Sequence, residues 1–127
     1  MQILGHGVDL VHIPRIARMV DEHGEHFLAR CFTQAERDYA AGHRAGAERL
    51  AARFAAKEAA LKALGTGLRS GIVWTELSVV RTSEGAPQLR VEGQAAAVAR
   101  LLGIHSWRLS LSHAGEYAMA SVIALSD

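Results

Sequence analysis

The fold is decided by the stretch Phe54-Ala55-Ala56-Lys57-Glu58-Ala59-Ala60-Leu61-Lys62-Ala63-Leu64-Gly65-Thr66-Gly67, an alanine-rich helical segment that ends in a Gly-Thr-Gly turn. At 3.6 residues per turn, Phe54, Glu58 and Lys62 lie on one face of the helix. Gly65 is a natural left-handed C-terminal cap, and side chains do not block the N–H groups of the turn. A carboxylate, an ammonium group one turn later and an open glycine turn together suit phosphate-transfer chemistry.

Glu58 and Lys62 also fit a simpler role as a surface ion pair. Their i,i+4 spacing and order are favourable for such a pair, which contributes only about 0.3–0.5 kcal/mol. A second stripe on the same helix, formed by Arg49, Arg53 and Lys57, argues against this simpler role. Like charges at this spacing repel each other, so the stripe suggests that this helix prepares a site for a polyanion.

Composition sets limits on the class of protein. The chain has 127 residues, of which 50% are hydrophobic and 21% charged, so we expect one globular domain over residues 1–127. The formal net charge of +1 gives no support to general nucleic-acid binding. The single cysteine, Cys31, fits a buried apolar position in a reducing compartment. We expect a cytoplasmic protein without membrane contact, because neither a signal peptide nor an apolar run of about 18–20 residues is visible.

The apolar periodicity and the turn residues predict an α+β fold, with helices before and between the strands. Gly24 should break the first helix, and Gly65 to Gly71 should form a loop. We expect strands over residues 3–12, around Leu77 and Val79, around Leu89 and Val91, and twice between Trp107 and Leu125. We expect helices from Pro14 through Val20, after the capping box of Thr33 and Glu36, from Ala47 to Leu64, and from Gly93 through Leu102.

Two further positions are candidates for chemistry. Asp9, in Gly7-Val8-Asp9-Leu10, is a carboxylate in an apolar strand, which is costly unless it is paired or bound to a metal. Its glycine-flanked context would help a ligand approach the backbone, while an outward-facing or turn-binding carboxylate is the alternative. Ser112 and His113 end a strand and point to opposite faces, so they suit ligand binding or a structural role better than a nucleophile–base pair.

Asp9, the helix motif and the Ser-His strand occur in this order in one short chain. This combination resembles the holo-acyl-carrier-protein synthase family, the short 4′-phosphopantetheinyl transferases. The matching segments are Gly7-Val8-Asp9 with Arg15-Ile16 beyond it, Phe54 through Gly67, and Ser110 through His113 followed by Glu116-Tyr117-Ala118. The resemblance covers nearly the whole chain. It implies a compact α+β domain in which an antiparallel sheet packs with the long Ala-rich helix.

The resemblance also implies an activity, namely transfer of 4′-phosphopantetheine from coenzyme A to a serine of an apo acyl carrier protein, in fatty-acid or polyketide synthesis. The other product is adenosine 3′,5′-bisphosphate. Asp9 and Glu58 would hold Mg²⁺, Glu58 would act as the base directly or through a metal-bound water, and Lys62 would neutralise or protonate the leaving phosphate. The implied coenzyme A contacts are Arg53, Gly65, Thr66, Gly67, Ser112 and His113, and the hairpin turn near Pro87 would line the adenine pocket.

The same resemblance implies two kinds of partner. The protein would form a homotrimer with active sites at subunit interfaces, where His113 of one subunit faces Asp9 and Glu58 of its neighbour. It would also have a docking surface for an acidic helix of the carrier protein. The implied docking residues are Arg15, Met19, Phe27 and Arg30.

One feature departs from this pattern. The acidic residues Asp21, Glu22 and Glu25 on the first helix would repel an acidic partner. Either the carrier is less acidic than usual or the helix presents a different face. A non-catalytic module that binds coenzyme A or a nucleotide is the alternative function, against which the intact Asp9, Glu58 and Lys62 weigh.

Overall fold

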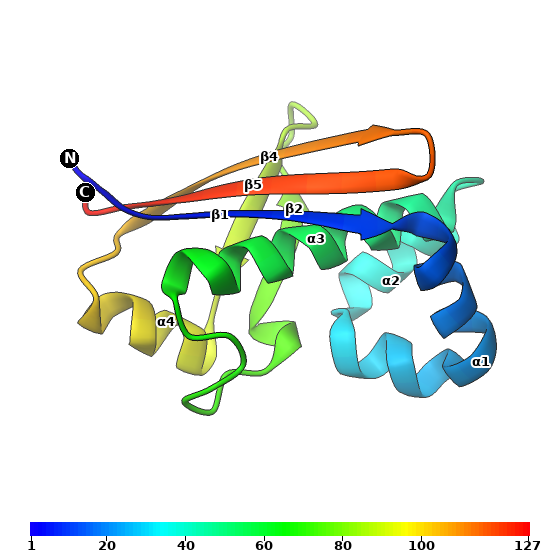
Figure 1. Cartoon of the computed structure of the whole chain (residues 1–127), viewed down its shortest axis with the longest axis horizontal. Helices are drawn as coiled ribbons and strands as arrows, with labels where there is room; N and C mark the ends of the chain where they lie inside the picture. Colours follow the sequence, from blue (N-terminus) through cyan, green and yellow to red (C-terminus); the bar gives the residue numbers. More distant parts are fainter.

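The computed structural model describes residues 1–127, and its helices and strands follow one another as the sequence predicts (Figure 1). The elements are β1 (Ile3–His12), α1 (Ile13–Cys31), α2 (Gln34–Ala41), α3 (Gly46–Leu64), a short 3-10 turn η1 (Trp74–Glu76), β2 (Leu77–Arg81), β3 (Pro87–Val91), α4 (Gly93–Leu101), β4 (Ser106–Ala114) and β5 (Tyr117–Leu125). The predicted α+β class is confirmed. None of the helices is long and apolar enough to cross a membrane.

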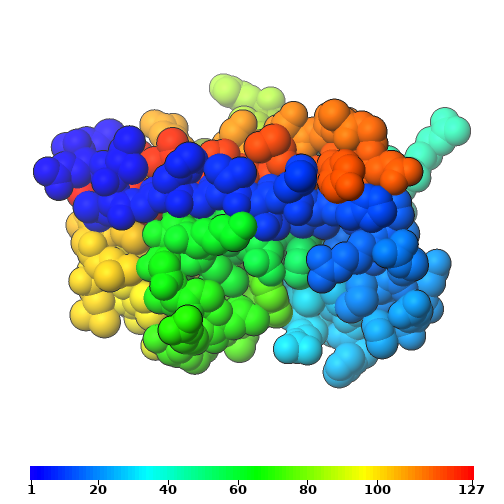
Figure 2. Space-filling view, viewed as in Figure 1, coloured from blue at the N-terminus to red at the C-terminus, as the bar shows by residue number.

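The strands form two antiparallel units. β1, β5 and β4 make a three-stranded sheet with β5 in the centre, while β2 and β3 form a separate hairpin. In the register of β1 against β5, Ile3 lies opposite Leu125 and Asp9 opposite Ala120, so the two chain termini meet at one end of the sheet (Figure 1). β1 is an edge strand and is exposed along most of its length (Figure 2).

The long helix α3 packs against the inner face of this sheet at unusually short range. A Cβ atom on Gly5 would lie 2.1 Å from the carbonyl oxygen of Ala63, and one on Gly7 would lie 1.9 Å from that of Ala59. Only glycine permits this approach. The glycines near Asp9 therefore admit the backbone of α3, and the expectation that they open the strand to a ligand is wrong.

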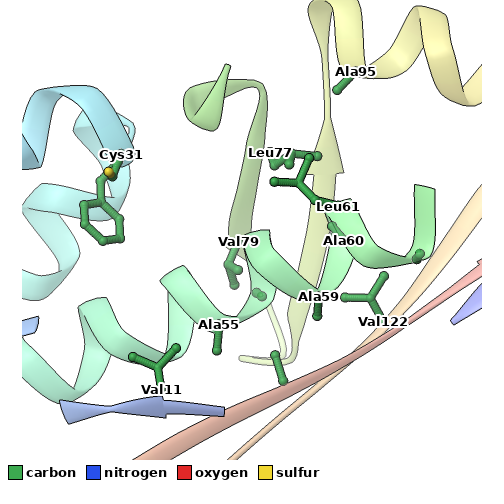
Figure 3. Close-up of a cluster of buried hydrophobic side chains, with 14 of the residues drawn as sticks. Val11, Cys31, Ala55, Ala59, Ala60, Leu61, Leu77, Val79, Ala95 and Val122 are labelled. Atoms are coloured by element: carbon green, nitrogen blue, oxygen red, sulfur yellow. The ribbon is translucent and has the colours of Figure 1, made fainter. Parts of the chain in front are cut away.

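Small side chains fill the interface between the sheet and α3. On β5 the inward-facing residues Ala118, Ala120, Val122 and Ala124 are fully buried. Figure 3 shows Ala55, Ala59 and Ala60 of α3 in the same core, with Val122 on the sheet side and Leu77 and Val79 on the side of β2. The alanine content of α3 thus serves close packing on two sides, and it fixes the helix relative to β1.

The predicted helix boundaries agree with the structure, with one extension. Gly65 caps α3 in the left-handed conformation (φ 79°), and Thr33 and Glu36 form the predicted capping box at α2. Gly24 does leave the helical region (φ 49°, ψ −125°), but the helix resumes and continues to Cys31. Burial of Phe27 and Cys31 in the core explains why the chain returns to helix after the break.

Candidate active site

β1 and α3 bring Asp9 and Lys62 together, although they lie far apart in the sequence. Lys62 Nζ donates a hydrogen bond to Asp9 Oδ1 at 3.1 Å and another to the carbonyl oxygen of Val8 at 2.9 Å. The Asp9 side chain is only 16% exposed and the Lys62 side chain 54% exposed. The structure therefore forms neither an outward-facing Asp9 nor a Glu58–Lys62 surface pair.

Glu58 lies beside this pair, half-buried on α3. Burial raises the pKa of the Glu58 carboxyl, and the negative charge of Asp9 raises it further. The positive charges of Lys62 and Arg15 act in the opposite direction without cancelling the shift in pKa. Glu58 is thus a stronger base than an exposed glutamate, as a group that accepts a proton during a reaction should be.

The same carboxylates are the candidate ligands for a divalent cation. Asp9 and Glu58 are close enough to interact electrostatically, and the structure has no group of three or more acidic, histidine or cysteine side chains that could hold a metal. Mg²⁺ commonly takes only one or two carboxylates and completes its coordination with water and substrate phosphate. The donor set therefore fits magnesium better than a metal that needs a complete protein cage.

A cavity of about 480 Å³ opens next to Glu58 and Lys62, and the glycine turn forms one wall of it. Gly65 (φ 79°) and Gly67 (φ 59°) both line it, and a Cβ atom at either position would meet no atom within 4 Å. Thr66 lies between them, and its hydroxyl donates to the carbonyl oxygen of Gly67. The turn is open toward this cavity, where a phosphate has room to approach its N–H groups.

The four predicted docking residues also meet, in a groove of about 490 Å³ along α1. The groove is lined by Arg15, Ile16, Met19, His23, His26, Phe27, Arg30, Cys31, Phe54 and Trp74. Phe54 stacks against Trp74, with ring centroids 5.0 Å apart. Trp74 also lines the cavity of Glu58, so the groove and that cavity adjoin.

The acidic residues of α1 do not line this groove. Asp21 lines a different, mostly apolar cavity between α1, α2 and the start of α3. Glu25 pairs with Arg37 of α2, whose guanidinium lowers the pKa of the Glu25 carboxyl. Glu22 lies 3.9 Å from His23 at the exposed surface. The part of α1 that lines the groove is therefore free of these three acidic side chains.

Arg53, Ser112 and His113 come together in a second, separate cavity of about 240 Å³. Pro87 of the hairpin lines it as well, while none of its lining residues belongs to the cavity of Glu58. His113 Nε2 lies 3.4 Å from Glu48 Oε1. The predicted coenzyme A contacts thus fall into two groups within one chain.

The expectation that Lys57 shares a polyanion site with Arg49 and Arg53 is wrong. The Lys57 side chain is fully buried, and its Nζ lies 2.8 Å from Glu36 Oε1. It also donates to the carbonyl oxygens of Trp74 and Leu77. Lys57 is therefore neutralised inside the core and has no contact left for a ligand.

Arg81 of β2 takes the place of Lys57, so that three arginines surround the ring of Tyr39. We call Arg49, Arg53 and Arg81 the arginine cluster. Their guanidinium carbons lie 6.0, 4.4 and 5.3 Å from the centre of the Tyr39 ring. Sequence reasoning missed Tyr39 and Arg81, because they lie on different elements, and nothing in their local sequence marks them.

A family model described as the 4′-phosphopantetheinyl transferase superfamily matches residues 5–122. The fold and the site thus define a transferase of that superfamily. A holo-[acyl-carrier-protein] synthase of Koribacter versatilis is 49% identical over 121 residues, which cover 95% of this chain and 97% of that protein. The chain belongs to the holo-[acyl-carrier-protein] synthase family, as its sequence motifs predict.

Solved structures agree with this assignment. The crystal structure of holo-[acyl-carrier-protein] synthase from Neisseria meningitidis matches with a TM-score of 0.89 and 31% identity, over 98% of this chain and 99% of that one. The Bacillus anthracis synthase in complex with coenzyme A (3′,5′-ADP) matches with a TM-score of 0.82 and 33% identity over the full length of both chains.

Proposed function

We propose that this protein transfers 4′-phosphopantetheine from coenzyme A to a serine of an apo acyl carrier protein, for fatty-acid or polyketide synthesis in the cytoplasm. The observation that carries the proposal is the meeting of Asp9, Glu58 and Lys62 beside an open glycine turn. A solved relative that is 33% identical binds coenzyme A. The other product is adenosine 3′,5′-bisphosphate.

The residues of the site have complementary roles in this reaction. The carrier serine oxygen attacks the β-phosphorus of coenzyme A, and the bond from that phosphorus to the bridging oxygen breaks. Glu58, which lines the cavity beside Lys62, accepts the proton of the serine hydroxyl. Lys62 is held over Asp9 by its two hydrogen bonds and neutralises the charge that develops on the leaving phosphate. Positioning and charge stabilisation supply most of the rate enhancement.

We assign Asp9 and Glu58 as the residues that hold Mg²⁺, because the two carboxylates are close enough to interact and Glu58 lines the cavity. When bound, Mg²⁺ would neutralise charge on the pyrophosphate of coenzyme A. Thr66 and Gly67 would bind the phosphates through backbone N–H groups, while Gly65, whose own N–H donates to the carbonyl oxygens of Leu61 and Lys62, would leave room for them. Arg53, Ser112 and His113 would contact the adenosine end, in the cavity that Pro87 also lines.

The groove along α1 would bind the carrier protein. Arg15 and Arg30 offer positive charge to an acidic helix, while Met19 and Phe27 offer apolar contact. Because the groove adjoins the cavity of Glu58 at Trp74, a docked carrier would place its serine close to the base.

We also propose that the protein acts as a homotrimer whose active sites lie at subunit interfaces. The outer face of the sheet carries exposed apolar side chains on neighbouring strands, among them Val8, Leu10, Tyr117 and Met119. Such a face is suited to a contact between subunits. A trimer would also let the cavity of Arg53 in one subunit face that of Glu58 in the next.

Mass spectrometry of an apo acyl carrier protein tests the function. After incubation with this protein, coenzyme A and Mg²⁺, we expect the carrier to gain about 340 Da, the size of phosphopantetheine, through phosphoryl transfer. Glu58→Ala should abolish the gain, and Glu92→Ala, which removes an exposed carboxylate that lines neither cavity, should not. Absence of any gain with several carriers while coenzyme A still binds would instead favour a binding module.

A further inference from the structure

Two exposed histidines line the groove along α1, although the proposed reaction uses neither. His23 and His26 share this groove with Arg15 and Arg30. Arg15, Met19 and His23 follow one another at four-residue intervals, and His26 and Arg30 repeat that spacing after the break in the helix. The groove therefore carries two permanent positive charges and two positions whose charge depends on pH.

The carboxylates of α1 leave most of this charge available to a partner. Glu25, which is next to His26 in the sequence, pairs instead with Arg37 of α2. Glu22 lies 3.9 Å from His23 Nε2 at the exposed surface, so it offsets part of the charge on that histidine. His26 forms no ion pair with a carboxylate of the protein, and its charge is free to act on a bound molecule.

The other walls of the groove do not add a charge that changes near neutral pH. Phe54 of α3 and Trp74 of η1 are uncharged, and burial raises the pKa of the Cys31 thiol, which keeps it protonated. Of the charged groups of α3 that act on Cys31, Lys57 is already neutralised in the core, while Glu58 lines the adjoining cavity. The two histidines therefore set how the charge of the groove varies with pH.

The inference rests on the proposed transfer to an acidic carrier protein. We propose that His23 and His26 are docking residues whose protonation tightens the binding of the carrier, so that the groove holds an acidic helix more strongly near pH 6 than near pH 8. Histidine gains positive charge as the pH falls through this range, while the carboxylates of an acidic helix stay ionised. The arginines would support docking at every pH, and the histidines would adjust its strength.

The test measures the KM for an acidic apo carrier protein at pH 6, 7 and 8, with saturating coenzyme A and Mg²⁺ at constant ionic strength. The KM of the wild type should rise about three- to tenfold from pH 6 to pH 8, as expected when two exposed charge contacts are lost. His26→Gln should remove most of this rise by raising the KM at pH 6. His23→Gln should remove a smaller part, because Glu22 already offsets that charge.

The charge-restoring variant separates docking from a structural role. His26→Arg should keep a low KM at pH 8, because arginine stays charged there although it differs from histidine in shape. His105→Gln, which changes an exposed histidine outside the groove, should follow the wild type at every pH. The dissociation constant of the carrier, measured by fluorescence anisotropy without coenzyme A, should change by the same factors as KM.

Three results would count against the inference. A wild-type KM that does not vary with pH would overturn it while leaving the transfer reaction intact. The same holds for a pH dependence that survives in the double variant His23→Gln with His26→Gln, and for a His26→Arg protein that behaves like His26→Gln at pH 8. If the wild type transfers nothing to any carrier and binds none, the proposed function fails together with the inference.

Discussion

Helix α3 carries two lysines five residues apart that each pair with a carboxylate, and the two pairs differ in almost every other respect. The Lys57–Glu36 pair is buried at both side chains, while Lys62 in the Lys62–Asp9 pair is 54% exposed. Glu36 also accepts hydrogen bonds from the N–H groups of Thr33 and Val79, so the buried pair joins α2, α3 and β2. We propose that the motif combines one structural lysine and one functional lysine.

The two lysines differ in whether their ammonium groups are available to a ligand. Burial lowers the pKa of Lys57 despite the nearby Glu36, which shows how costly the buried charge is. All three contacts of its ammonium group are to the protein. Lys62 can exchange its contact with Asp9 for a phosphate, because it faces an open cavity beside Glu58.

The largest effect on stability should come from breaking the buried pair. Lys57→Met leaves the Glu36 carboxylate buried without its cation and should lower the free energy of unfolding by about 3–5 kcal/mol. Urea denaturation measures the change. The double variant Lys57→Met with Glu36→Gln should recover part of the loss. A loss below about 1 kcal/mol in the single variant would contradict the structural role of Lys57.

The next largest effect should come from disturbing the packing of α3 against β1. The Lys62–Asp9 pair depends on this packing because Asp9 lies on β1, whereas the Lys57–Glu36 pair does not involve β1. Gly7→Ala places a Cβ atom 1.9 Å from the carbonyl oxygen of Ala59, so α3 must move away from β1. We expect a loss of about 1–3 kcal/mol in unfolding free energy and a lower transfer rate, because Lys62 reaches across from α3 to Asp9. Gly42→Ala is the matched control, since a Cβ there meets nothing closer than 3.6 Å. A stable and fully active Gly7→Ala would be inconsistent with this packing.

The same comparison shows what the sequence could reveal. Local rules predicted α3, its cap at Gly65 and the capping box at Thr33, because each depends on residues within a few positions. They placed Lys57 on an exposed stripe, since the repeat along a helix does not say which face another element covers. The partner of Lys57 is Glu36 on α2, and that of Lys62 is Asp9 on β1, and only the tertiary fold brings them together.

A smaller effect should come from the groove that adjoins the exposed pair. Arg30→Ala removes a positive charge from the docking surface and should raise KM for the carrier protein about tenfold while kcat changes little, because one interfacial charge contact is lost. Arg18→Ala changes an exposed arginine of the same helix that does not line the groove. Equal effects of the two substitutions would argue against a defined docking site. Steady-state kinetics with varied carrier concentration measures both.

The smallest effect is a pH dependence at Glu58. The pKa of Glu58 is raised above 4.5 in the folded protein, so the folded state holds this proton more tightly than the unfolded state does. Stability should therefore fall as pH rises from about 4.5 through the raised pKa in chelator-treated protein. Glu58→Gln should lack this contribution, so its unfolding free energy relative to wild type should increase over that window. A difference that stays constant with pH would contradict the shift in pKa.

The most direct test of the contrast between the two lysines is Lys62→Met, studied for transfer and stability in parallel. We expect the transfer rate to fall about 10²–10³-fold, as when a group that stabilises transition-state charge is removed. The loss of unfolding free energy should be clearly smaller than that in Lys57→Met, because Lys62 is 54% exposed and water can replace its ammonium group beside Asp9. A variant that keeps its activity, or one as unstable as Lys57→Met, would contradict the assignment of Lys62 to function and Lys57 to structure.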